Sequence, residues 1–126
     1  MSNNQLAKNY VADVAIPAYR FVKPGTADDR ITLATASTDA IIGCSTDIAA
    51  AAGERCDVQL AEVAYIEAGA AIARGSLLTA DASGRAIVAA PATGINASVA
   101  GRALETAAAA GDIIRYMQSI GQIQGQ

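Results

Sequence analysis

The residues that could support catalysis in this 126-residue chain are two cysteines, four tyrosines, two lysines and scattered carboxylates, because the sequence contains no histidine. Histidine is the commonest general base and metal ligand, so its absence removes every Ser-His-Asp arrangement. The only adjacent acidic pair is Asp28-Asp29, which follows Pro24-Gly25 in a segment typical of turns. We therefore interpret this pair as a solvated turn and not as a catalytic dyad.

Ligand sets for metals and nucleotides are also missing from the sequence. A zinc site needs four clustered ligands, whereas Cys44 and Cys56 stand alone, without a histidine. The stretch Asp81-Ala-Ser-Gly84 carries one acid where a calcium loop needs several. No G-x-x-x-x-G-K-[ST] phosphate loop occurs. We expect no cofactor, no metal and no enzymatic activity.

The elements that position these residues must be built from small side chains. Of the chain, 52% is hydrophobic, yet it has one Phe, no Trp and 31 alanines among its 126 residues. Buried area sets the hydrophobic stabilisation, at about 25 cal/mol per Å², so a core of this kind is weak for its size. A chain with such a core gains stability by binding a partner, and we expect an oligomer or a protein that docks on a larger surface.

Charge and hydropathy exclude two classes of partner. The net charge is −3 and the nine basic residues are spread singly, which argues against nucleic acid. No apolar run approaches the length of a membrane span, and the start, MSNNQLAKNY, lacks the apolar core of a signal peptide. We expect one soluble domain, made in the cytoplasm, with no membrane partner.

One part of the chain can be laid over a later part without a gap. The stretch IIGCSTDIAAAAGERCDVQL, residues 41–60, then faces VAGRALETAAAAGDIIRYMQ, residues 99–118, and the two AAAAG runs coincide. Upstream segments also correspond, with a gap of about two residues, and each half reads as apolar runs separated by turns. Pro24-Gly25, with a positive φ expected at the glycine, and Asp81-Ala-Ser-Gly84 are the predicted turns.

The AAAAG runs allow a helical or a turn interpretation. Alanine has the highest helix propensity, but a helix shorter than about 12 residues is marginal in isolation. The flanking pairs Ile41-Ile42 and Ile113-Ile114 favour strands. We therefore predict a strand, a compact turn or a single helical turn at AAAAG, and a returning strand; a further strand is predicted from Val58 to Ile66.

The fold class that follows is all-β, with at most one or two short helical turns. We expect a compact β-barrel from two tandem pseudo-repeats at residues 11–118, with a flexible N-terminal arm at 1–10 and a C-terminal tail at 119–126. On this interpretation Cys44 and Cys56 face each other across a hairpin centred near residue 50, either as two packed thiols or as a disulfide. The four tyrosines are core edges or contact anchors, with contact favoured for Tyr10.

Two stretches in the second half resemble the capsid cement (decoration) proteins of tailed bacteriophages. They are IEAGAAIARGSLLTADASGRA, residues 66–86, and AGRALETAAAAGDIIR, residues 100–115. The resemblance runs from about residue 16 to residue 117 and concerns the small β-rich type, some members of which carry a RecA-like label. The missing phosphate loop contradicts that label. Ser76 departs from the family's usual Asp, and the tail after Tyr116 departs as well.

The resemblance implies a structural virion protein on the exterior of the mature capsid, where it binds and stabilises the lattice of the major capsid protein. It also implies self-association, as a homotrimer or a dimer, and synthesis in a bacterial host. We expect the N-terminal arm to become ordered on the capsid by pairing with a strand of the shell protein. The candidate capsid contacts in this arm are Ser2, Asn3, Asn4, Gln5, Leu6, Lys8 and Tyr10.

A second resemblance belongs to another functional class. The pattern Ala-Gly-x-x-Ile-x-x-Gly-x-x-Leu at residues 68–78 is similar to β-clip modules that bind carbohydrate or accompany sugar-processing enzymes. Such a module is expected to expose an aromatic platform, and this chain has no Trp and one Phe. The alternative function is therefore a β-clip carbohydrate-binding module or an accessory subunit of an enzyme.

Overall fold

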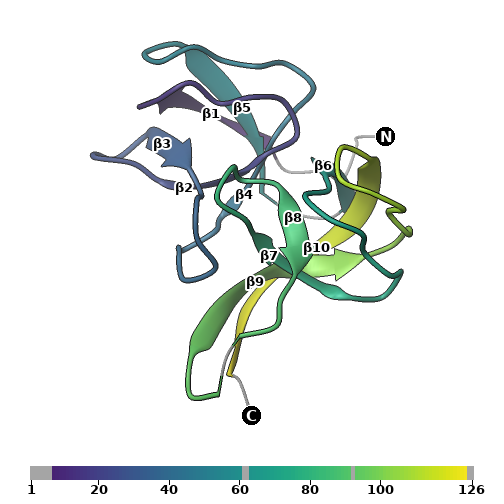
Figure 1. The fold of residues 1–126 in the computed structure, drawn as a ribbon. Helices are drawn as coiled ribbons and strands as arrows, with labels where there is room; N and C mark the ends of the chain where they lie inside the picture. The colour runs from purple at the N-terminus through teal and green to yellow at the C-terminus, as the bar shows by residue number, and fades with distance from the viewer. Residues whose placement is uncertain (1–6, 61–62, 92, 125–126) are drawn as a thin grey trace, which may run out of the picture.

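The computed structural model describes residues 7–60, 63–91 and 93–124, which form β-strands and no helix (Figure 1). The strands of the first half are β1 (Ala7–Ala12), β2 (Phe21–Pro24), β3 (Arg30–Leu33), β4 (Gly43–Ser45) and β5 (Arg55–Gln59). Those of the second half are β6 (Val63–Glu67), β7 (Leu77–Ala80), β8 (Ala86–Val88), β9 (Asn96–Ala103) and β10 (Ile113–Gln124). The prediction of an all-β fold is confirmed.

Both halves have the same strand order. The first half is a closed barrel, β1-β3-β2-β4-β5, in which β1 pairs with β5 and, in parallel, with β3. The second half is a five-stranded sheet, β6-β10-β9-β7-β8, whose ends approach through one parallel bridge between Ala68 and Ala86. The two tandem repeats therefore do not share one barrel, because each repeat folds on itself through local antiparallel pairs.

The sequence repeat has a structural counterpart, because one close contact between neighbouring strands occurs at equivalent positions in both halves. Gly43 in β4 packs so tightly on β5 that a Cβ atom there would collide with the carbonyl oxygen of Gln59. Gly101 in β9 packs in the same way against the carbonyl oxygen of Met117 in β10. The alignment that lays Gly43 on Gly101 also lays Gln59 on Met117, so glycine is required twice for one close approach.

The AAAAG runs are turns, as predicted. In the first half Ile16 and Ala50 exchange two backbone hydrogen bonds of 2.8 and 2.9 Å, and the chain then reverses at Gly53, where φ is 86°. Ile72 and Ala107 form the same bridge in the second half. These links to a distant segment satisfy backbone groups that a helix would have paired internally, which is why high alanine propensity does not produce a helix here.

An acidic residue closes each of these turns. The Glu54 side chain accepts a 2.8 Å hydrogen bond from the Ala51 amide. Asp112, at the equivalent position, accepts a 2.9 Å bond from the amide of Ala108. The acid after each glycine is therefore part of the repeat, because it binds amides that the turn leaves free.

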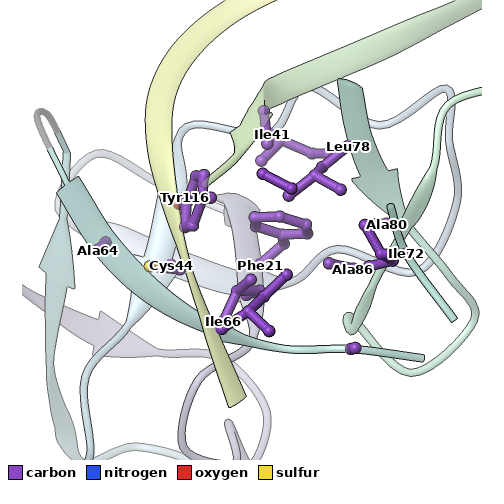
Figure 2. Packing of buried hydrophobic residues seen from close by; sticks show 14 of the residues in the cluster. Phe21, Ile41, Cys44, Ala64, Ile66, Ile72, Leu78, Ala80, Ala86 and Tyr116 are labelled. Carbon is purple, nitrogen blue, oxygen red and sulfur yellow. The ribbon is translucent and has the colours of Figure 1, made fainter. Parts of the chain in front are cut away.

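Strand β2 contributes to two cores at once. Successive residues of a strand point to opposite faces. Val22 therefore lies in the smaller cluster inside the first barrel, together with Ile31 and Val58. Phe21 points the other way and joins the larger cluster, which is formed mainly by the second half (Figure 2).

Phe21 meets Tyr116 edge to face inside this larger cluster. The ring centroids are 5.6 Å apart and the rings are perpendicular, a geometry that aromatic pairs favour. Ile66 and Leu78 pack around the two rings (Figure 2). Both rings are fully buried, so the only phenylalanine of the chain holds its two halves together.

The prediction that Cys44 and Cys56 face each other is wrong. Both are buried and free, but Cys44 pairs with Gln59, and Cys56 pairs with Tyr10 on β1. The register is shifted because the AAAAG turn is anchored to a distant segment instead of forming a symmetric hairpin. Cys44 thus shares the face of Phe21 and lies in the larger cluster, while Cys56 lies in the smaller one.

The two halves exchange the positions of an aspartate and a glycine. In the first half Asp13 follows β1 and its carboxylate lies over Gly25, where a Cβ atom would collide with it. In the second half the glycine is Gly69, after β6, and the carboxylate comes from Asp81 in the turn before β8. Glycine at position 25 thus leaves room for the Asp13 carboxylate. The positive φ expected at Gly25 occurs instead at Asp29, where it is 65°.

Each of these carboxylates fastens the turn beneath it. Asp13 accepts a 2.8 Å bond from the amide of Thr26 and pairs with the Arg30 guanidinium. Asp81 accepts a 2.8 Å bond from the amide of Ser83 and lies 3.3 Å from the Arg85 guanidinium. The hydrogen bond from Arg30, followed by the one from the Thr26 amide, lowers the pKa of Asp13. Its stabilising effect is therefore present above the usual carboxyl pKa and is lost as the pH falls through the lowered value.

Three predicted boundaries lie elsewhere in the structure. Residues 7–10, expected in the arm, belong to β1, and β10 continues to Gln124 through the expected tail. The strand predicted from Val58 to Ile66 is divided into the end of β5 and the start of β6. Both ends of the chain are paired in the described residues because their backbones complete the edges of neighbouring strands.

The equivalence of the two halves at these positions can be tested by exchanging Asp13 and Gly25. We expect Asp13→Gly to lower the melting temperature by a few degrees because it releases the turn, and Gly25→Asp to lower it because two carboxylates meet. The double variant reproduces the arrangement of the second half and should recover most of the loss. Circular dichroism melts at pH 7 measure this, and a double variant no more stable than the weaker single variant would contradict the equivalence of the halves.

Phe21 should dominate the stability of both halves. Phe21→Ala is expected to lower the free energy of unfolding by about 3–5 kcal/mol, the range for deleting a buried aromatic ring, and Phe21→Leu by less. The control Ile48→Ala, at a side chain that is 69% exposed, should change it by less than about 0.5 kcal/mol. Urea titrations followed by circular dichroism give these values, and a Phe21→Leu variant indistinguishable from the control would disprove the assignment.

Candidate functional site

Both thiols of the described residues are buried, and several acidic side chains hold turns or ion pairs. No three His, Cys, Asp or Glu side chains gather in residues 7–60, 63–91 and 93–124 as a metal site would require. Asp28 and Asp29 are exposed in the turn between β2 and β3, as predicted. This part of the chain also contains no helix that could cross a membrane.

The buried thiols and the buried phenol are held in their neutral forms. Burial raises the pKa of Cys44 to about 11 and that of Tyr116 well above its usual value. Burial also raises the pKa of Cys56. Because the thiolate is the reactive form, neither cysteine is activated as a nucleophile. The Tyr116 hydroxyl instead donates a 2.9 Å bond to Gln118, whose amide donates a 3.0 Å bond to the carbonyl oxygen of Ile42.

The predicted capsid contacts are placed in part. Ser2, Asn3, Asn4, Gln5 and Leu6 lie outside the described residues. Lys8 is exposed on β1, with its ammonium 3.7 Å from Asp29 and 5.4 Å from the ring centroid of Tyr10. Tyr10 is half-buried against the smaller core cluster, so it is a core edge with part of its surface accessible. Its role in a capsid contact stays a prediction.

Strand β1 has an open backbone edge near these residues. It pairs with β5 from Ala7 to Val11, but with β3 only at Val11 and Ala12. In the described part of the chain, residues 7–10 therefore have a strand on one side only. Such an edge can accept a strand from another protein.

A groove between the two halves carries exposed tyrosine. It has a volume of about 270 Å³. Its lining residues come from both halves: Tyr19, Ser45, Thr46, Asp47, Gln59, Val63, Ala64 and Tyr65. The rings of Tyr19 and Tyr65 meet edge to face at 6.4 Å, and Tyr65 is 52% exposed. Tyrosine on a surface of this kind is typical of protein interfaces, because it combines a large apolar face with a hydroxyl group.

Tyr19 stands in a backbone conformation that favours glycine. Its φ is 59°, and Gly75, at the corresponding turn of the second half, has a φ of 92°. For a residue with a Cβ atom this left-handed conformation costs about 1–2 kcal/mol. The strain is offset by a 3.0 Å hydrogen bond from the Glu67 amide to the carbonyl oxygen of Tyr19. Tyr19 thus carries a side chain at a position where the second half has glycine. This difference points to a role for the Tyr19 side chain in contact with another protein.

The sequence alone does not distinguish Tyr19 from the other three tyrosines. The signal that finds it is the comparison of the halves, in which the alignment upstream of the AAAAG runs needs a short gap. With that gap Tyr19 falls on Gly75. The positive φ that makes the substitution informative, however, is visible only in the structure.

One solved structure illustrates how the fold is used elsewhere. A crystal structure of the N base of head fiber gp8.5 in bacteriophage phi29 matches with a TM-score of 0.69 and 22% sequence identity. The match covers 91% of this chain and 94% of that one, so the two have the same fold. A comparison with curated proteins found no match.

The sequence itself matches a protein family. The family is described as phage cement protein, and its model covers residues 1–118, which is most of the chain. This match includes both repeats, both AAAAG turns and the two tyrosines of the groove. The resemblance found in the sequence is confirmed: the chain belongs to the phage cement protein family.

Proposed function

We propose that this protein binds the outer surface of the mature phage capsid as a homotrimer and stabilises the lattice of the major capsid protein, without catalysing a reaction. The observation that carries the proposal is the family match over residues 1–118. Membership of that family makes the chain a structural, capsid-associated protein of a phage virion. The fold shared with a phage head fiber base supports the same assignment.

The mechanism is differential binding. A subunit that binds the mature lattice and not its dissociated state stabilises the lattice by RT ln(1 + [L]/Kd), about 2.7 kcal/mol per site at a hundredfold excess over Kd. Attachment through several subunits of one oligomer multiplies the effect, since the second contact forms at high effective concentration. The protein needs a docking surface for this task and no reactive group.

Two features fit the contact with the major capsid protein. The open edge of β1 continues the N-terminal arm, so an added strand of the shell protein can pair with residues 7–10. The groove offers Tyr19 and Tyr65 as aromatic anchors. Aromatic anchors supply a large part of the binding free energy in protein interfaces, whereas backbone pairing sets orientation.

Removal of the arm tests the first contact. A variant lacking residues 2–6 should occupy purified mature heads at least tenfold more weakly than the full chain, because on this proposal the arm extends the contact with the shell beyond residues 7–10. Its melting temperature should be unchanged, since β1 begins at Ala7. Binding is measured by sedimentation of heads with added protein, and full occupancy by the shortened chain would rule the arm out.

Tyr19 tests the second contact and separates binding from stability. Tyr19→Gly relieves the left-handed strain, so we expect an unchanged or higher melting temperature but about tenfold weaker binding to heads, as for an interface anchor. The matched control is Gly75→Ala, which places a Cβ atom at a φ of 92° in the other half. That control should lose about 1–2 kcal/mol of stability and retain binding. Equal head binding by Tyr19→Gly and the wild type would remove the groove from the interface.

A further inference from the structure

The C-terminal part of β10 leaves the body of the second half as a two-stranded ribbon. In the described residues the pairing of β10 with β6 ends at the pair Met117–Val63, and β10 then follows β9, from the pair Gln118–Gly101 to the pair Gln124–Asn96. A register shift between Gln118 and Gly121 marks the start of the ribbon. In Figure 1 the ribbon, in green and yellow, extends beyond the other strands of the second sheet.

In the described residues the ribbon has an open backbone edge on its β10 side, whereas on its β9 side Ala97, Ser98, Val99 and Ala100 are buried. Strand β7 pairs with β9 only at Gly101 and Arg102, so residues 96–100 have β10 as their sole strand neighbour. Along this stretch the Ser98 amide donates a 2.7 Å bond to the carbonyl oxygen of Ser37 in the first half. An isolated two-stranded ribbon is marginal in water, and open edges pair readily with another chain.

The ribbon also lacks the charges that usually protect such edges. Residues 86–101 contain no charged side chain, and neither do residues 116–126. The family match ends at residue 118, where the ribbon begins, so the second strand of the ribbon is outside the part that the family describes. Soluble proteins commonly block an exposed edge with lysine, proline or a bulge, and only the register shift is present in this strand.

Apolar surface accompanies the open edge. Ile120 lies in the register shift and is 55% exposed. It borders two hollows, of about 240 and 430 Å³, on either side of the strand. The hollows share Ile120, Gly121 and Gln122, and the larger one also reaches Ile41 and Ile42 of the first half. A partner that pairs with the edge can therefore bury Ile120 at the same time.

We propose that this ribbon is the surface through which copies of this chain bind one another. The proposal rests on the self-association stated in the proposed function and assigns it to residues 118–124 of β10. A second copy is the occupant that the charge pattern favours. Each copy carries a net charge of −3, and copies can meet along an uncharged ribbon without bringing like charges together. The shell protein is then bound at the other surfaces, the β1 edge and the tyrosine groove.

The test uses the full chain and two matched isoleucine variants. Light scattering coupled to size exclusion gives the mass of the wild type, of Ile120→Lys and of Ile48→Lys over a hundredfold range of concentration. Ile48 is 69% exposed in the turn between β4 and β5 and controls for the added charge. We expect oligomers for the wild type and for Ile48→Lys, and at least tenfold weaker association for Ile120→Lys. Circular dichroism should show the same strand content in all three.

Two outcomes would overturn the inference. A wild type that is monomeric throughout the range, or an Ile120→Lys variant with the mass of the wild type, excludes the ribbon as the contact between copies. Sedimentation with purified heads separates this result from a failure of the proposed function. Full head binding by a monomeric wild type leaves the cement function intact and removes only the ribbon assignment. An oligomeric Ile120→Lys variant that no longer binds heads would assign the ribbon to the shell protein instead.

Discussion

The fold depends on a strand that is buried on both of its faces. Because side chains alternate along β2, Val22 fills the first barrel while Phe21 crosses into the larger cluster and meets Tyr116. The chain is rich in alanine, and neither half contains many large apolar side chains of its own. One strand shared between two cores couples the halves, so that burial in one supports the other. The inter-half groove, with its two tyrosines, exists because the halves are joined in this way.

The duplication repeats backbone more strictly than side chains. Gly43 and Gly101 recur because a carbonyl group leaves no room for a Cβ atom in either half. The halves differ where either of two facing segments can supply the same carboxylate. In the first half Asp13 lies over Gly25, and in the second half Asp81 lies over Gly69. Tyr19 differs in another way, since it occupies a conformation for which its counterpart, Gly75, is better suited. Departures of this second kind are informative about function, because stability alone does not explain them.

Membership of a phage cement family agrees with the physical character of the molecule. Burial holds the two thiols in their neutral form, and the acids that follow the AAAAG runs fasten turns. What the surface provides is open strand edges and exposed apolar or aromatic side chains. Such surfaces suit assembly, in which free energy comes from area and repetition more than from any one group.

The sequence by itself determined the fold class, the repeat and the AAAAG turns, because these depend on local propensity and on spacing along the chain. It also indicated the family through the residues around Gly69 and Gly101. Only the tertiary structure decided that the repeats form separate sheets, that Cys44 and Cys56 lie in different cores, and that β10 extends as a ribbon. These features depend on register and on which face of a strand meets which core. A shift of one residue reverses both, and small, similar side chains do not specify that shift in the sequence.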